Sequence, residues 1–172
     1  GDGGLVLVGH SYGGAVVTQV AAGRDDIDHL VYVAAFALDD GESVMGALGS
    51  FERRDVALAG AMVPSDDGSS TTLDPRAATA LYQCCPEPAA NAAVARLDTQ
   101  PRATMTETVS GRPRDAIAST YVVCLRDDAV HPDHQAAMAA RCTHQVELDT
   151  DHSPSLSAVP ELADVIDPLV GS

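Results

Sequence analysis

The residues that most constrain the fold lie close to the start of the sequence. Residues 5–8 are four consecutive apolar residues, which is typical of a short buried strand in a parallel sheet. The sequence GHSYGG (9–14) follows, and the apolar residues 15–22 predict a helix that ends at Gly23. The glycines around Ser11 permit a sharp turn that would direct the serine hydroxyl out of the sheet.

The pattern Gly-x-Ser-x-Gly between a strand and a helix is typical of a nucleophilic serine on a strained turn. The N-terminus of the following helix would offer free N–H groups and the positive end of a dipole where an oxyanion forms. An ordinary glycine-rich turn is the plain alternative. A phosphate-binding loop is disfavoured, because the sequence has neither Gly-Lys-Ser/Thr nor Gly-x-Gly-x-x-Gly.

Composition excludes several classes of protein. Apolar residues make up 45% and charged residues 20% of the 172 residues, as in a soluble globular domain, and we expect a cytoplasmic protein. The formal charge of −15 argues against binding to nucleic acid or to anionic membranes. No apolar run approaches the ~20 residues of a membrane span. The four cysteines lack C-x-x-C spacing, which favours reduced structural thiols over metal ligands: Cys84, Cys85, Cys124 and Cys142.

The rest of the core follows an alternating pattern. A second buried strand is predicted at 29–36, which completes a βαβ unit and implies a parallel sheet with a right-handed crossover. Further strands are predicted at 119–125 and 145–149, and helices at 133–141, with Asp133 as N-cap, and at 160–170. We therefore predict an α/β fold whose core comprises residues 1–37 and 116–172.

Residues 38–115 have a different character, and we call them the inserted segment. Gly, Ser, Asp, Pro and Ala become frequent, no strand is predicted, and helices are expected at 75–82, capped by Asp74, and at 89–97. Long insertions at the carboxyl ends of strands carry binding surfaces in such folds, so we predict a helical lid over Ser11. An excursion without contact to a substrate is the alternative.

Acidic residues and a histidine follow the last two predicted strands. Asp127 and Asp128 come after strand 119–125, and His152 follows strand 145–149. Parallel strands end at the same edge of a sheet, so these side chains should meet Ser11 there. A serine nucleophile needs an adjacent base that a third group orients. His152 would accept the Ser11 proton, and the acid would hold the imidazole in the correct tautomer.

At these residues the sequence resembles the α/β-hydrolase superfamily, and more closely the small lidded esterases of the plant methylesterase and hydroxynitrile-lyase type with their bacterial relatives. The resemblance spans nearly the whole chain and rests on GHSYGG (9–14), LYQ (81–83) followed by CCPE, the turn at 127–132, and the Asp-His pair 151–152. In that family the acid stands five positions before a proline, which implies Asp127, with Asp128 as the alternative.

The resemblance implies an α/β-hydrolase that cleaves small carboxylic esters through an acyl-enzyme, without a cofactor or metal. The backbone N–H of Tyr12 would be one oxyanion donor; the family's other donor lies upstream of this sequence. Lyases of the family carry a lysine after the catalytic histidine, where this chain has Ser153, which favours ester hydrolysis. A non-catalytic ligand-binding receptor on the same fold is the alternative, as is another serine-dependent reaction (thioesterase, lactonase or hydroxynitrile lyase). The sequence leaves substrate identity and oligomeric state open.

A complete fold of this kind should place about four strands and two helices, on the order of 80 residues, before the serine. We therefore expect a partial fold that lacks its first strands and exposes an apolar sheet edge. The isolated chain should then be poorly soluble and inactive.

The remaining candidate residues receive plain structural interpretations. His10 is expected to pack beneath Ser11, and His29 to be a surface or hydrogen-bonded residue. The pair His131 and His134 is not expected to bind a metal. His144 is predicted at the surface, and Asp149 and Asp151 are interpreted as solvated loop acids.

Overall fold

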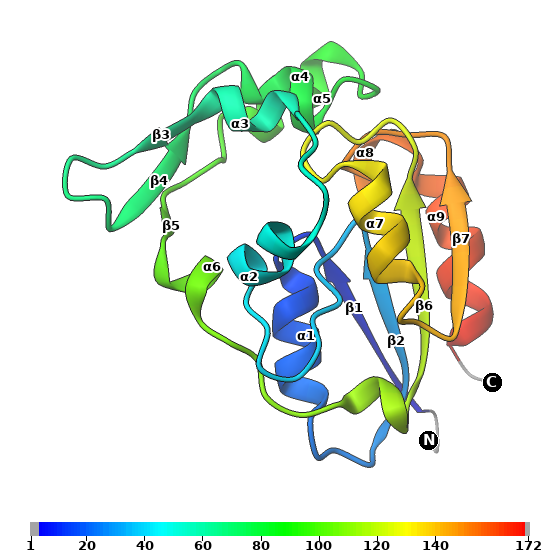
Figure 1. Ribbon diagram of the computed structural model, residues 1–172. Coiled ribbons are helices and arrows are strands. Elements are labelled where there is room, and N and C mark those ends of the chain that lie inside the picture. Colours follow the sequence, from blue (N-terminus) through cyan, green and yellow to red (C-terminus); the bar gives the residue numbers. More distant parts are fainter. Residues whose placement is uncertain (1–3, 171–172) are drawn as a thin grey trace.

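A four-stranded parallel sheet forms the core of the computed structural model, which describes residues 4–170 (Figure 1). The spatial order is β1-β2-β6-β7, and every neighbouring pair is parallel. The strands are β1 (Leu5–His10), β2 (Ile27–Val33), β6 (Ala118–Cys124) and β7 (His144–Leu148). The predicted α/β class with a parallel sheet is confirmed.

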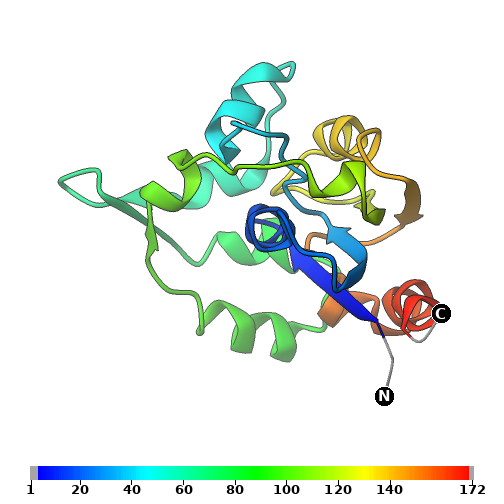
Figure 2. The same ribbon diagram turned by 90° about the horizontal axis from the view of Figure 1, so that it is seen from below.

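Helices cover both faces of this sheet (Figure 2). Helices α1 (Gly13–Ala21) and α7 (Pro132–Ala139) pack on one face, against alternate residues of the central strands such as Leu30 and Tyr121. Helix α9 (Val159–Ile166), continued by η2 (Asp167–Leu169), packs on the other face against Val31, Val33 and Val122. The two central strands are therefore buried on both sides, which explains their continuous apolar sequences.

The inserted segment lies between β2 and β6 and contains more than the predicted helices. Its helices are α2 (Val44–Ser50), α3 (Ala57–Ala61), α4 (Ala77–Leu81), α5 (Glu87–Val94), α6 (Ala103–Thr106) and η1 (Pro113–Asp115). A small antiparallel sheet joins β3 (Met62–Pro64), β4 (Ser70–Leu73) and β5 (Gln100–Pro101). The expectation that strands disappear here was wrong, because strands of two to four residues are too short to show a periodic pattern.

Two predicted boundaries need correction. Strand β2 ends at Val33 instead of 36, because Ala34 adopts a positive φ of 44° that breaks the extended chain. The cap of α7 is His131, whose Nδ1 accepts the Asp133 N–H at 3.1 Å, and Asp133 itself lies in the first turn. Pro132 occupies the first helical position, where its missing N–H costs nothing, and this moves the cap two residues upstream.

Strand β1 forms one edge of the core sheet and is poorly covered. Val8 of β1 is 47% exposed, and the neighbouring helix α1 exposes Val16 and Val20. An uncovered apolar edge strand is a site for pairing with another chain segment.

None of the helices within residues 4–170 could serve as a membrane span.

Candidate active site

Ser11 occupies a strained turn between β1 and α1. Its φ is +53°, a left-handed conformation that is rare outside glycine and is found where tertiary structure enforces it. Two backbone hydrogen bonds hold the turn against the end of β2: the Ser11 N–H donates to the Val33 carbonyl at 3.1 Å, and the Phe36 N–H donates to the Ser11 carbonyl at 3.1 Å. The serine is thus fixed at the carboxyl edge of the sheet.

The glycines of the turn are not equivalent. A Cβ on Gly9 would lie 2.6 Å from the Gly13 carbonyl oxygen, and one on Gly14 would lie 2.7 Å from the Phe36 carbonyl oxygen. A Cβ on Gly13 would meet nothing within 4 Å among the described residues. Close approach of backbone to backbone therefore demands glycine at 9 and 14, whereas the last glycine of the motif is not sterically required here.

Tyr12 stands at the N-cap of α1, where backbone N–H groups lack partners within the helix. Across residues 4–170, the Tyr12 N–H makes no backbone hydrogen bond. This donor and the positive end of the helix dipole are available to an anion beside Ser11.

Asp127 and His152 meet at the same sheet edge, although they lie on loops after different strands. His152 Nδ1 lies 2.7 Å from Asp127 Oδ2, and both side chains are buried. The other carboxylate oxygen, Oδ1, accepts the N–H groups of Ala129 at 2.7 Å and Val130 at 2.9 Å. These bonds fix the carboxylate and orient the imidazole, leaving its Nε2 to face another group.

Gln135, which was not predicted from the sequence, completes this arrangement. Its fully buried amide donates from Nε2 to Asp127 Oδ2 at 2.8 Å and to the Val130 carbonyl at 2.7 Å, and its Oε1 accepts the Cys124 N–H at 2.9 Å. Asp127 therefore receives four donors in all. A glutamine in the apolar face of a helix that follows an acidic turn is the only signal that the sequence offered.

His10 connects the serine turn to the histidine loop. Its ring centroid lies 4.6 Å from that of His152, and its Nε2 donates to the His152 carbonyl at 2.7 Å. Desolvation, followed by the charge of His152, lowers the pKa of His10 to about 4, which keeps this ring neutral. His10 thus packs on His152 and does not serve as a base. Among residues 4–170 no hydrogen bond joins the Ser11 hydroxyl to His152; catalytic hydrogen bonds are often long before substrate binds.

The other sequence candidates lie outside this arrangement. Asp128 Oδ1 accepts the Ala57 N–H at 2.8 Å, so this carboxylate contacts the inserted segment and not the imidazole. His29 is hydrogen-bonded to Thr120, and His144 is exposed, as expected. Within residues 4–170 no three His, Cys, Asp or Glu side chains are grouped to hold a metal. In particular, no third such side chain joins His131 and His134 in a metal-binding group within this range.

The two acids that flank His152 differ sharply. Asp149 is exposed and paired with Arg126, as the interpretation of a solvated loop acid predicted. Asp151 is fully buried, so the same interpretation was wrong for this residue. Its carboxylate is covered by the turn at Cys84 in the inserted segment, a contact between positions 67 residues apart. A local pattern cannot reveal such a contact.

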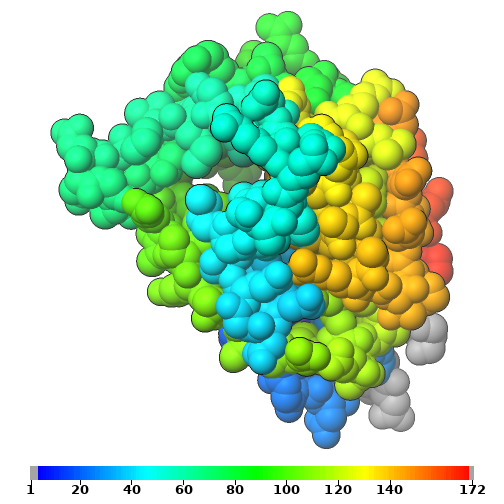
Figure 3. All heavy atoms as spheres, in the orientation of Figure 1, coloured from blue at the N-terminus to red at the C-terminus, as the bar shows by residue number. Residues whose placement is uncertain are grey.

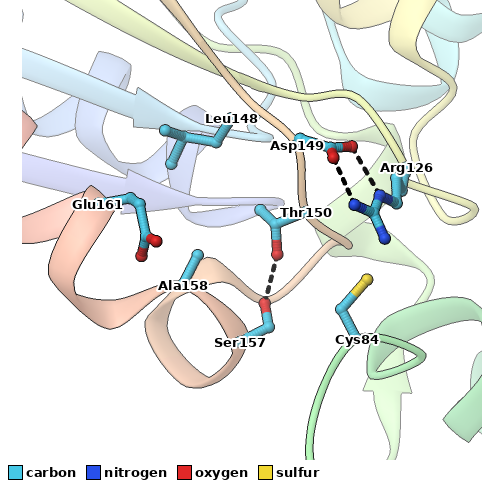
Figure 4. Close-up of a pocket in the computed structure, with 8 residues that line it drawn as sticks. All are labelled: Cys84, Arg126, Leu148, Asp149, Thr150, Ser157, Ala158 and Glu161. Atoms are coloured by element: carbon cyan, nitrogen blue, oxygen red, sulfur yellow. Dashed lines mark hydrogen bonds and ion pairs between the residues drawn. The ribbon is translucent and has the colours of Figure 1, made fainter.

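The inserted segment spans the sheet edge, and a space-filling view shows an opening between α2 and the hairpin β3–β4 (Figure 3). A separate cavity of about 320 Å³ lies where the inserted segment meets the β7 loop. Cys84, Arg126, Thr150 and Ser157 are among its lining residues, and Ser11 and His152 are not (Figure 4).

A model described as the alpha/beta hydrolase family matches residues 1–165. The alpha/beta hydrolase nvfD of Aspergillus novofumigatus is 31% identical over 166 residues, which cover 89% of this chain and 64% of that protein. The chain therefore spans less than two thirds of the length of this curated relative.

Solved structures with the same fold include a pyrethroid hydrolase from Sphingobium faniae JZ-2, with a TM-score of 0.78 and 22% identity over 96% of this chain and 70% of that one. A methylesterase from Arabidopsis matches with a TM-score of 0.73 and 18% identity over 96% and 68% of the two chains. Polyneuridine aldehyde esterase matches with a TM-score of 0.76 and 17% identity over 96% and 71%. At these identities the matches show the fold, of which this chain covers about 70%.

Proposed function

Because the chain belongs to the alpha/beta hydrolase family, we propose that it is a serine hydrolase that cleaves small carboxylic esters through an acyl-enzyme. Ser11 is the nucleophile, His152 the general base and acid, Asp127 the orienting carboxylate, and the Tyr12 N–H an oxyanion donor. The observation that carries the proposal is the buried 2.7 Å contact between His152 and Asp127 at the edge that also bears the strained Ser11.

The reaction follows from this arrangement. Asp127 holds the proton on Nδ1 of His152, so Nε2 accepts the Ser11 proton while Oγ attacks the ester carbonyl carbon. The tetrahedral oxyanion faces the Tyr12 N–H. When the intermediate collapses, His152 gives its proton to the leaving alkoxide and the alcohol departs. Water then attacks the acyl-enzyme with His152 as base, which releases the carboxylic acid and restores Ser11.

Two observations support an ester as substrate. Two of the similar structures are named as esterases, a methylesterase and polyneuridine aldehyde esterase. Ser153, and not a lysine, follows His152, which favours hydrolysis over cyanohydrin cleavage. The inserted segment, residues 38–115, is proposed as the lid that selects a small, largely apolar ester. A cytoplasmic location and the lack of a nucleic-acid partner stay predictions from composition.

Turnover of p-nitrophenyl butyrate by the full-length protein tests this proposal. Replacing Ser11 with Ala should lower kcat by on the order of 10⁶-fold, because no other group can form the acyl-enzyme. Ser69→Ala changes an exposed serine of the inserted segment and serves as the matched control. Equal turnover by the wild type and Ser11→Ala would refute the proposal.

A fluorophosphonate probe separates catalysis from ligand binding alone. The probe should label Ser11 and leave Ser11→Ala unlabelled. A well-folded protein that neither reacts with the probe nor hydrolyses the ester would instead be a ligand-binding receptor on the same fold.

A further inference from the structure

Asp151 is a second buried carboxylate at this sheet edge, and the proposed reaction gives it no role. Its Oδ1 accepts the Ser153 N–H at 3.0 Å and the Ser157 hydroxyl at 2.6 Å, and its Oδ2 accepts the Cys84 N–H at 2.7 Å. None of the ion pairs found within residues 4–170 includes Asp151. A buried charge held only by neutral donors is costly, so a residue that keeps one calls for an explanation.

The Cys84 hydrogen bond joins two distant parts of the chain. Cys84 lies in the turn between α4 and α5, whereas Asp151 directly precedes His152. The neighbouring Gln83 donates from its side chain to the Arg126 carbonyl at 2.6 Å, one residue before Asp127. The turn between α4 and α5 is therefore hydrogen-bonded to two loops, the one that carries Asp127 and the one that carries His152. Figure 4 shows the Cys84 side chain beside Arg126, close to the loop that carries Asp149 and Thr150.

Cys85 adds a weaker contact of the same kind. Its Sγ lies 3.8 Å from Asp151 Oδ2. Desolvation, followed by the charge of Asp151, raises the pKa of the Cys85 thiol to about 11, so the sulfur keeps its proton at neutral pH. A protonated thiol can donate weakly to the carboxylate, whereas a thiolate would repel it.

We propose that Asp151 is a positioning residue that couples closure of the inserted segment over the sheet edge to alignment of His152 with Asp127. Its Oδ1 shapes the histidine loop from within, and its Oδ2 binds the turn at Cys84. A substrate that holds this turn in place thereby also holds the general base in place. The kinetic part of this inference rests on the proposed ester hydrolysis, and the structural part does not.

The coupling has a physical basis in the chain itself. Asp151 and His152 share a peptide unit, so a shift of the Asp151 carboxylate moves the backbone that carries the imidazole. A displacement of about 1 Å at a reacting group can cost on the order of 10²-fold in rate. A free turn at Cys84 would also loosen the inserted segment, the proposed lid, so both kcat and KM should respond.

The Asp151→Asn variant tests the kinetic part. Asn keeps the size of the side chain but replaces one of the two acceptor oxygens with an N–H₂ group, so that either the Cys84 N–H or the Ser153 N–H faces a donor. With p-nitrophenyl butyrate, kcat/KM should fall about 10- to 100-fold, through both a lower kcat and a higher KM. Asp149→Asn, in the same loop but exposed, should leave both constants unchanged. Unaltered constants in Asp151→Asn would overturn the inference.

Hydrogen exchange tests the structural part without any substrate. In the wild-type protein the amides of Cys84 and Ser153 should open with the same free energy, because one carboxylate holds both. In Asp151→Asn both should lose protection together, while the amides of Ala129 and Val130, which Asp127 holds, keep theirs.

Each other outcome of this measurement has a defined meaning. Faster exchange at Cys84 alone, at Ser153 alone or throughout the chain would overturn the coupling, and so would unchanged exchange at both amides. If Asp151→Asn does not fold, different opening free energies for Cys84 and Ser153 in the wild type would overturn it as well. If the full-length wild-type protein fails to hydrolyse the ester, the proposed function fails, and the exchange data alone then decide whether the coupling exists.

Discussion

The carboxyl edge of the core sheet and the inserted segment are built in contrasting ways. At the sheet edge, buried polar side chains form several hydrogen bonds each, and Asp127 alone receives four. The inserted segment consists of helices of at most eight residues and strands of at most four, and its hairpin exposes Met62 and Val63. The first region is restrained from many directions, whereas the second packs on the core through Val44, Ala47 and Val109 and extends its hairpin away from the core (Figure 1).

This difference indicates that the sheet edge and the inserted segment have different roles. Groups that need fixed geometry for proton transfer lie where each atom has several partners, because a small displacement there is costly. The hairpin β3–β4 can vary in shape without disturbing those groups, since none of the hydrogen bonds found within residues 4–170 joins it to the edge. The turn at Gln83 and Cys84, by contrast, is hydrogen-bonded to the loops that carry the acid and the base. Substitutions should therefore have their largest effects at the edge and their smallest effects at exposed positions of the inserted segment.

The largest effect is expected for Asp127→Asn. An amide at this position would turn an N–H₂ group toward His152 and stabilise the tautomer that cannot accept the Ser11 proton, lowering kcat on the order of 10⁴-fold. Asp128→Asn is the matched control, because within residues 4–170 the Asp128 carboxylate accepts the Ala57 N–H and is not bonded to His152, and an Asn oxygen can accept the same bond. Steady-state kinetics with p-nitrophenyl butyrate measure both. A similar loss of kcat in Asp127→Asn and Asp128→Asn would contradict the different roles of these two carboxylates.

Gln135→Met should give the next largest effect. Methionine fills the same volume but leaves the Cys124 N–H and the Val130 carbonyl without their partner, at a cost of roughly 1–3 kcal/mol each. Asp127 would also lose one of its donors, so the imidazole that it orients should be less well fixed and kcat should fall about 10-fold. Chemical denaturation and steady-state kinetics with p-nitrophenyl butyrate measure the two effects.

Gln145→Met is the control for that variant, since Gln145 is exposed on β7. It should change neither stability nor kcat. An unaltered kcat in Gln135→Met would show that Gln135 does not position the acid–base pair.

Gly14→Ala should destabilise the fold by about 1–3 kcal/mol, because its Cβ would overlap the Phe36 backbone. Gly13→Ala provides a control within the same motif: its Cβ meets nothing within 4 Å among the described residues, and the free energy of unfolding should stay nearly constant. Urea denaturation of the two variants compares them. Equal destabilisation would mean that the two glycines are equivalent after all.

The smallest effect is expected in the inserted segment, for Arg54→Gln. Arg54 pairs with Glu52 at 2.9 Å and with Asp133 at 2.7 Å, but both carboxylates are exposed. Such exposed pairs stabilise a fold only slightly and weaken as salt rises, so the urea midpoint should move little. Arg53→Gln, which removes an arginine with a 3.9 Å contact to Asp55, should leave the midpoint unchanged. A loss for Arg54→Gln as large as that for Gly14→Ala would place this region among the well-restrained parts of the molecule.

Local sequence predicted the elements that depend on neighbouring residues. Apolar runs located all four core strands, and the glycine-rich motif located the turn at Ser11. The order of strands along the chain was enough to predict that Asp127 and His152 meet, because parallel strands end on one side. The small antiparallel sheet escaped prediction, since strands of two to four residues leave no periodic signal.

By itself, then, the sequence determined the α/β architecture, the position of Ser11 and the edge at which an acid and a histidine meet. Only the tertiary structure decided which polar side chains are buried: Gln135 rather than Gln145, and Asp151 rather than Asp149. The physical reason is that strand and helix periodicity arise from neighbouring residues, whereas the burial of a polar group depends on donors that folding brings from distant positions, such as Cys84 for Asp151.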